Sequence, residues 1–239
     1  MITFVTVIKI IHHDFSLALN LYVDSIVTQI TCDYEIIIVE DICDKNTARY
    51  QVPVHPCVRY IPYHATYPNP YNYPLIEAYA KNVGIRAAKF PFICVTNCDI
   101  LFSPEFFPFL TTLEPKTFYR FPQYELVAIP TSFAEALTLP TTPLNHLCST
   151  STLKDIAFKS GDIMLLDADS WLKIKGFPEN TIWVHSDLIV CKVAQNNGFA
   201  LNIPSVRIFT SPHARAALPG APALEMSYAY LNASACNPR

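Results

Sequence analysis

The chain has 239 residues, of which 51% are hydrophobic and 15% are charged, a composition that predicts a folded α/β domain rather than a disordered chain. Its formal net charge of −3 lacks the basic excess of nucleic-acid-binding proteins, so we expect no nucleic-acid partner. No apolar run reaches the roughly 18 residues of a membrane span and no charged leader precedes the first strand, which predicts a cytoplasmic protein.

The first part of the chain alternates apolar segments typical of buried strands with amphipathic segments typical of helices. Strands are predicted at residues 2–11, 34–39 and 59–61, and helices at residues 14–30 and 75–89. Asp41 follows the second strand, where a carboxylate either contacts a nucleotide or caps a helix. Gly84 lies inside the second helix at a cost of about 1 kcal/mol relative to alanine, which predicts a close approach of this helix to the sheet.

The segment from Phe90 to Ser103 is the most informative stretch of the sequence. An apolar strand around Phe92–Val95 ends in the polar residues Asn97 and Asp99, and Ser103 is predicted to cap the next helix, over residues 104–113. Ligands bind at the carboxyl ends of strands in open parallel sheets. Asp99 is therefore either a buried, hydrogen-bonded carboxylate or a ligand for a metal ion or a substrate hydroxyl.

The second part of the chain predicts shorter elements. Two strands are expected within residues 116–130, a loop or acceptor-side flap at 131–152, a strand at 163–166 and two short strands within 199–209. A short helix is expected to begin at Asp169 or Ser170 and to end at Gly176. A further helix is expected to begin at residue 185 or 186 and to end at Gly198.

Two segments together resemble a known family. The stretch KNVGIRAAKFPFICVTNCD, residues 81–99, resembles the "Arg-Asn-x-Gly-x-x-x-Ala, apolar strand, DxD" unit of nucleotide-sugar-dependent glycosyltransferases with the GT-A fold. Residues 159–198, with Gly176-Phe177-Pro178-Glu179 and an acidic residue opening a helix, resemble the second half of the inverting, family-2-type members. The match is partial, because Asn97 stands at the first acidic position of the DxD segment and His185-Ser186-Asp187 replaces an acidic pair.

The resemblance implies one GT-A domain over residues 1–239, with a mixed, mostly parallel central sheet flanked by helices and a small secondary sheet. Residues 1–103 would form the nucleotide-sugar-binding half, residues 104–213 the acceptor-side and catalytic half, and residues 214–239 a C-terminal tail. The implied activity is metal-assisted transfer of a sugar from a nucleoside-diphosphate sugar to a hydroxyl of a glycan or glycoprotein.

The resemblance also implies roles for individual residues. Mn²⁺ or Mg²⁺ would be bound by Asn97, Asp99 and His213, and Asp187 would be the catalytic base. The donor would be contacted by Asp41, Lys81, Asn82, Arg86, Asn97 and Asp99, and the acceptor by Asp162, Trp183 and His185. Simpler interpretations stay open: Lys81 and Arg86 as helix-surface cations, Asp187 as a partner of the helix dipole, and His213 as a structural histidine.

Two other functions remain open from the sequence. A non-catalytic nucleotide-sugar or carbohydrate-binding domain is compatible with Asn97 in place of an acidic residue. A nucleotidyltransferase shares this architecture, but it would need a glycine-rich basic loop after the first strand, and the sequence VIKIIHHDF has no glycine.

Overall fold

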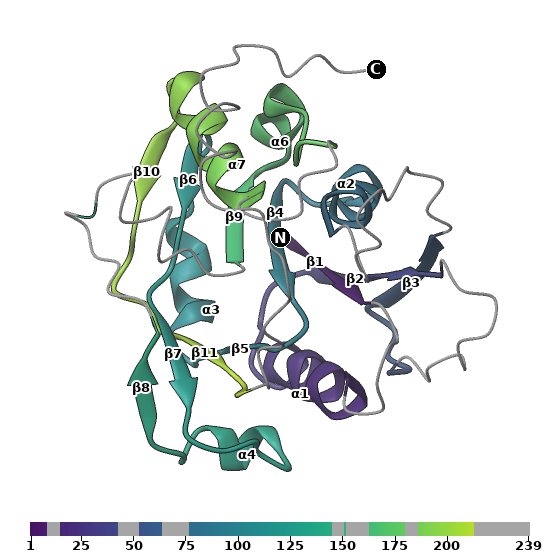
Figure 1. The fold of residues 1–239 in the computed structure, drawn as a ribbon, viewed down its shortest axis with the longest axis vertical. Helices are drawn as coiled ribbons and strands as arrows, with labels where there is room; N and C mark the ends of the chain where they lie inside the picture. Colours follow the sequence, from purple (N-terminus) through teal and green to yellow (C-terminus); the bar gives the residue numbers. More distant parts are fainter. Residues whose placement is uncertain are drawn as a thin grey trace, which may run out of the picture.

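The computed structural model describes residues 1–8, 15–42, 53–63, 77–144, 151, 163–179 and 186–212 (Figure 1). The strands are β1 (Ile2–Ile8), β2 (Tyr34–Asp41), β3 (Val58–Tyr63), β4 (Phe92–Asn97), β5 (Ile100–Phe102), β6 (Thr117–Tyr119), β7 (Gln123–Leu126), β8 (Thr141–Pro143), β9 (Ile163–Asp167), β10 (Ala200–Asn202) and β11 (Ile208–Thr210). The helices are α1 (Phe15–Val27), α2 (Glu77–Ala87), α3 (Phe106–Phe109), the 3₁₀ helix η1 (Leu110–Thr112), α4 (Phe133–Ala136), α6 (Ala168–Ile174) and α7 (Ser186–Asn196). Within these ranges, no helix has the length and apolar character needed to cross a membrane.

The strands form a seven-stranded sheet in the order β10-β6-β9-β4-β1-β2-β3 and a four-stranded sheet in the order β5-β11-β7-β8. In the larger sheet β1 pairs in parallel with β2 and β4, β2 with β3, and β10 with β6, whereas β9 runs antiparallel to β4 and β6. This arrangement confirms the predicted mixed, mostly parallel central sheet with a small second sheet. Because β1, β2 and β4 are parallel, their carboxyl ends meet at one edge of the sheet.

The two faces of the central sheet are covered by different helices (Figure 1). Helices α2, α6 and α7 pack on one face, where Val5, Val39 and Val95 belong to the same buried cluster as Trp171 and Cys191. The close approach predicted from Gly84 is confirmed on this face, because a Cβ atom at Gly84 would lie 2.2 Å from Cγ1 of Val5. Helix α2 therefore lies close against β1 and β2.

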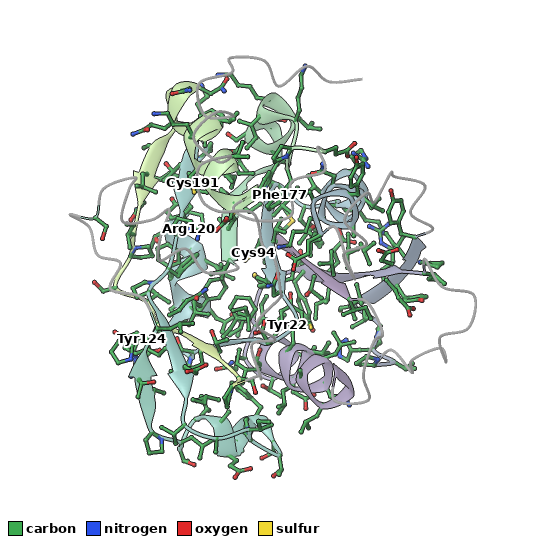
Figure 2. The ribbon with its side chains drawn as sticks, viewed as in Figure 1. Tyr22, Cys94, Arg120, Tyr124, Phe177 and Cys191 are labelled. Carbon is green, nitrogen blue, oxygen red and sulfur yellow. The ribbon has the colours of Figure 1, made fainter. Side chains whose placement is uncertain are left out.

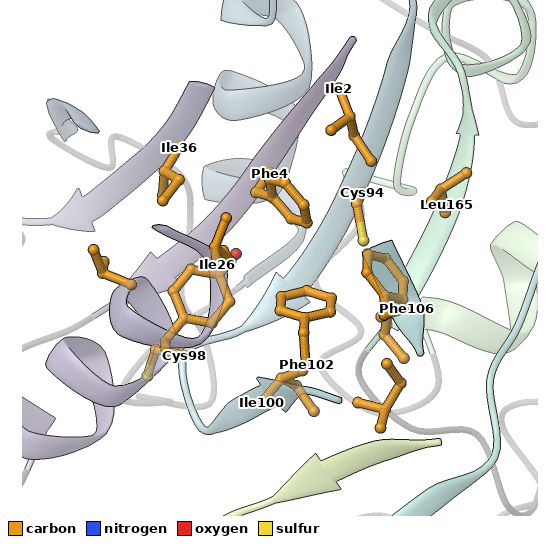
Figure 3. Packing of buried hydrophobic residues seen from close by; sticks show 14 of the residues in the cluster. Ile2, Phe4, Ile26, Ile36, Cys94, Cys98, Ile100, Phe102, Phe106 and Leu165 are labelled. Atoms are coloured by element: carbon orange, nitrogen blue, oxygen red, sulfur yellow. The ribbon is translucent and has the colours of Figure 1, made fainter. Parts of the chain in front are cut away.

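The opposite face packs against α1 and α3 through a core that combines aliphatic side chains with a group of phenylalanines (Figure 3). Phe102 is central to this core, with its ring centroid 4.5 Å from that of Phe106 and 5.1 Å from that of Phe4. All three side chains are fully buried, and burial of each such side chain contributes roughly 1.5–3 kcal/mol. Phe102 lies on β5, so this core fixes the chain immediately after the turn that contains Asp99.

Several predicted boundaries are wrong. The first-helix prediction continued to Ile30, but α1 ends at Val27. Ser103 is predicted to cap the next helix, but Glu105 occupies the N-cap position of α3 and no side chain caps this helix. Asp167 rather than Asp169 or Ser170 caps α6, because its carboxylate accepts a 2.9 Å hydrogen bond from the backbone N–H of Ser170.

The loop predicted for residues 131–152 contains regular structure. Helix α4 is capped by the Ser132 side chain, and β8 pairs with β7 to complete the second sheet. The predicted acceptor-side role of this segment remains a prediction. The two strand pairs predicted at 116–130 and 199–209 are confirmed, but each pair is divided between the two sheets.

Candidate functional site

The predicted donor-side residues Asp41 and Asn97 lie on one face of the central sheet. Side chains alternate between the faces of a strand, so Asp41 points to the same side as Val39, and Asn97 to the same side as Val95. Val39 and Val95 both belong to the core formed with α2, α6 and α7. Asp41 is only 3% exposed, and strand β2 extends through it because Asp41 pairs with Tyr63 of β3. The structure thus brings both residues to the carboxyl edge of the sheet, on the side of α7.

Asn97 carries the most informative polar atom of this edge. Its side-chain oxygen, Oδ1, is buried and has no hydrogen-bond partner among the residues that the structure describes. A buried amide oxygen without a partner costs roughly 1–3 kcal/mol, and nearly all such groups in folded proteins are satisfied by protein, water or a bound ligand. The partner of this oxygen is therefore expected outside the described residues, in another segment of the chain, in water or in a bound ligand.

Asp99 lies in the turn between β4 and β5, next to the end of β11. The backbone N–H of Ser211 donates a 3.0 Å hydrogen bond to the backbone oxygen of Asp99, and Thr210 pairs with Ile100. Strand β11 therefore ends beside the Asn97–Asp99 turn. His213, the third predicted metal ligand, follows two residues after Ser211 and lies outside the described residues.

Asn82 joins the two segments that carry the family resemblance. Its Nδ2 donates hydrogen bonds to the backbone oxygen of Phe177 at 2.8 Å and to Oε1 of Glu179 at 2.9 Å. Its Oδ1 accepts a 2.7 Å hydrogen bond from the backbone N–H of Phe177. Both amide hydrogens of this predicted donor-binding residue are therefore already donated to the Gly176–Glu179 loop.

The two predicted cations on α2 differ in their surroundings. Lys81 is 5% exposed, pairs with Glu77 at 2.6 Å and lies 5.4 Å from the ring centroid of Phe177, so it is not a helix-surface cation. The Arg86 side chain is exposed and forms an ion pair with Glu179 at 3.3 Å. Lys81 thus remains a candidate for contact with a diphosphate, whereas the structure places Arg86 at the surface.

Tyr63 is the last residue of β3 and lies near Glu179 of the Gly176–Glu179 loop. Burial raises the pKa of the Tyr63 hydroxyl, and the carboxylates of Glu179 and Asp41 raise it further, while the Arg86 guanidinium lowers it. These three charged groups are therefore near the hydroxyl of Tyr63. The Tyr79 hydroxyl also donates a 3.0 Å hydrogen bond to the backbone oxygen of Glu179.

Asp187 lies in the first turn of α7, on the same face of the sheet as Asn97. One turn later, burial raises the pKa of the Cys191 thiol to about 12, while the Arg120 guanidinium lowers it and the Asp187 carboxylate raises it. Arg120 is 1% exposed, and Figure 2 shows it beside Cys191. Arg120, a buried cation, and Asp187, the predicted base, therefore both lie near the Cys191 thiol.

Sequence reasoning missed Arg120 and Tyr79, and it did not single out Tyr63 from the other tyrosines of residues 53–74. A single arginine inside the apolar segment TFYRFP is the one local signal that could have indicated Arg120. Both tyrosines belong to a chain rich in tyrosine, so their type gave no reason to choose them.

Four predicted site residues cannot be placed. The acceptor residues Asp162, Trp183 and His185 and the metal ligand His213 all lie outside the described residues. Within the described ranges, no group of three or more His, Cys, Asp or Glu side chains is arranged to hold a metal ion.

No family model and no curated protein matches the sequence, whereas solved structures do match the fold. A structure described as mannosyltransferase PcManGT from Pyrobaculum calidifontis in complex with GDP-Man and Mn²⁺ matches with a TM-score of 0.55 and 12% identity over 90% of this chain. Two structures of S. aureus TarS 1–349, one in complex with UDP-GlcNAc, match with TM-scores of 0.58 and 0.59, at 12% and 11% identity over 88% and 89% of this chain. The chain covers 58%, 60% and 59% of those three chains, respectively. The predicted resemblance to the GT-A fold of nucleotide-sugar-dependent glycosyltransferases is therefore confirmed at the level of the fold.

Proposed function

We propose that this chain is a metal-assisted glycosyltransferase that moves a sugar from a nucleoside-diphosphate sugar to a hydroxyl of a glycan or glycoprotein. The observation that carries the proposal is the buried Oδ1 of Asn97 at the carboxyl edge of the sheet, which has no hydrogen-bond partner among the described residues. This atom lies two residues before Asp99, in a fold shared with structures that contain GDP-Man with Mn²⁺ or UDP-GlcNAc.

The residues of this edge fit a hard divalent cation. Mg²⁺ and Mn²⁺ prefer oxygen ligands, and Asn97 offers a carbonyl oxygen that has no partner among the described residues. Asp99 would add a carboxylate and His213 a further ligand. The metal, when bound, would supply positive charge that offsets the charge of the departing nucleoside diphosphate.

The chain's own residues would orient the two substrates. Asp41, at the end of β2, would accept hydrogen bonds from the nucleotide, and Lys81 would neutralise part of the diphosphate charge. Asp187 would accept the proton of the acceptor hydroxyl as its oxygen bonds to the anomeric carbon and the bond to the diphosphate oxygen breaks. A single displacement of this kind inverts the anomeric centre.

A binding domain without catalysis is the second candidate. It is favoured by the amide at Asn97, because a neutral oxygen binds a divalent cation more weakly than a carboxylate does. A domain of this type would bind a nucleotide sugar without releasing the sugar.

Binding and turnover can be separated in two steps. Thermal unfolding is first measured with UDP-, GDP- and dTDP-sugars, each with and without Mn²⁺, because a ligand that binds the folded state raises the unfolding temperature. The donor that raises it is then incubated with the protein and Mn²⁺, and free sugar is measured over time. Release of sugar by the wild type that is lost in Asp99→Ala supports the transferase. Binding without release supports the binding domain, and no stabilisation by any nucleotide sugar contradicts both.

A further inference from the structure

We propose that Asn82 is a positioning residue: it fastens helix α2 to the Gly176–Glu179 loop and so fixes the point from which the chain reaches Asp187. The inference rests on the proposed function for the role of Asp187, but the fastening itself does not. It gives Asn82 a task other than direct contact with the donor.

The hydrogen bonds of Asn82 use the whole amide group. Its two N–H donors go to the backbone oxygen of Phe177 and to the Glu179 carboxylate, and its oxygen accepts the N–H of Phe177. Asn82 is 2% exposed, so these bonds are made away from water. The side chain therefore pairs with Phe177 in the way that one β-strand residue pairs with another, which specifies both distance and orientation.

Gly176 shows how closely the loop approaches this amide. A Cβ atom at Gly176 would lie 2.2 Å from Oδ1 of Asn82, and the residue adopts a φ angle of +71°. Glycine is therefore needed here both for its backbone conformation and for the contact. By comparison, Gly198 has a φ angle of +77°, but a Cβ atom there would meet no atom within 4 Å among the described residues.

The loop is also held beyond Asn82. The Phe177 ring stacks on Trp171 with centroids 5.5 Å apart and an interplanar angle of 23°, and Figure 2 shows it between α6 and α2. The Glu179 carboxylate forms an ion pair with Arg86, and the Glu179 backbone oxygen accepts a hydrogen bond from the Tyr79 hydroxyl. Helix α2 thus holds the loop through several side chains, of which Asn82 is the most buried polar one.

The chain leaves this fastened loop at Glu179 and enters α7 at Ser186, with Asp187 as the second helical residue. A displacement at residues 176–179 therefore starts only a few residues from the proposed base. Misplacing a catalytic group by about 1 Å can reduce turnover by about 10²-fold. Donor contacts at Asp41 and Asp99 involve other strands, and Lys81 keeps its ion pair with Glu77 on α2, so donor binding should be retained.

The test uses paired variants of the full chain. Asn82→Asp keeps the oxygen that accepts from Phe177 but replaces the two N–H donors by an oxygen facing the Glu179 carboxylate. Gly176→Ala disrupts the same contact from the loop side, and Gly198→Ala is the matched control, with a similar φ angle but no contact. Combining Asn82→Asp with Glu179→Gln restores a donor opposite the new carboxylate.

Hydrogen exchange of backbone amides tests the fastening independently of activity. The first four amides of a helix have no partner within it, so the readout is the second turn of α7, residues 190–193. We expect faster exchange in this turn in Asn82→Asp and Gly176→Ala, no change there in Gly198→Ala, and partial recovery with Glu179→Gln. Unchanged exchange in the second turn of α7 in both disrupting variants would overturn the inference, whether or not the protein is a transferase.

Steady-state kinetics test the positioning role. If the wild type turns over, Asn82→Asp should lower kcat by about 10²-fold with unchanged donor affinity, and Glu179→Gln should recover part of the loss. Weaker donor binding with unchanged kcat would show direct donor contact and would overturn the inference. Lost stability with neither kinetic constant changed, measured well below Tm, would also overturn it. A wild type without turnover contradicts the proposed function, and the exchange experiment then decides on the fastening alone.

Discussion

Asn82, which is buried, and Asn97, which is half-buried with a hidden Oδ1, lie on the same side of the central sheet but differ in how their amides are satisfied. Every hydrogen of the Asn82 amide is donated within the chain, to groups 95 and 97 residues away. The Oδ1 of Asn97 is equally hidden from water but has no partner among the described residues. Because an unpaired buried group costs free energy, the contrast separates a residue that joins two segments of the fold from one whose oxygen needs a partner outside the described residues.

The largest expected effect is at Asp187, the proposed base, rather than at either asparagine. Removing a general base typically lowers turnover by 10²–10⁴-fold, so Asp187→Asn should reduce kcat by about this factor and leave donor binding unchanged. The measurement is sugar transfer together with calorimetric titration of the donor.

Asp169→Asn is the matched control for Asp187→Asn, because Asp169 is also an acidic residue in the first turn of a helix, but it is exposed on α6. Equal loss of turnover in both variants would show that only helix stability is involved. The assignment of Asp187 as base would then be withdrawn.

The second effect concerns metal affinity at the edge of the sheet that carries Asn97 and Asp99. Asp99→Asn removes a carboxylate and should weaken Mn²⁺ binding by at least about tenfold, whereas Asn97→Asp adds one and should strengthen it. Both are measured by Mn²⁺ titration in the presence of the stabilising nucleotide sugar. Asp24→Asn, on an exposed position of α1, controls for the change in net charge. Equal affinity in all four proteins would remove the metal from the proposal.

The third effect compares the two amides directly in the free protein. Asn82→Ala leaves the N–H and oxygen of Phe177 without their partner and should lower the free energy of unfolding by roughly 1–3 kcal/mol. Asn97→Ala removes an oxygen that has no partner in the described part of the chain, and it should change stability much less. Urea unfolding in the absence of metal measures both, and equal losses would mean that Asn97 is satisfied in solution.

The smallest effect is a pH dependence of stability at Tyr63, which lies near Glu179 and Asp41. Burial and then the Glu179 and Asp41 carboxylates raise the pKa of Tyr63 above its ordinary value of 10.0, so the folded state favours the protonated phenol. This contribution to stability is complete below about pH 10 and is lost as the pH rises through the pKa of the folded state. Tyr63→Phe should flatten the fall of stability in this alkaline range.

Urea unfolding between about pH 9 and pH 11 checks this dependence against the ordinary tyrosine pKa. Glu179→Gln removes one of the two carboxylates and should flatten the curve by a smaller amount than Tyr63→Phe. A wild-type curve identical to that of Tyr63→Phe would contradict the placement of Tyr63 among these charges.

The sequence by itself determined the features that depend on neighbouring residues. The apolar run before Asn97 predicts a buried strand because alternation and side-chain type act over a few residues. The glycines at 84, 176 and 198 predict a close approach and two helix ends because only glycine lacks a Cβ. The order of the strands and helices of the central sheet follows from such local signals, whereas α4 and β8 do not.

Only the tertiary structure decided which distant groups meet. Nothing local to Asn82 indicates that its amide pairs with Phe177, and nothing near Pro122 indicates that β6 and β7 belong to different sheets. Likewise Asp167 caps α6 because β9 ends there, and β2 extends to Asp41 because β3 lies beside it. A hydrogen bond depends on the positions of two atoms, and those positions are fixed by packing across the whole sheet rather than by the residue types along either segment.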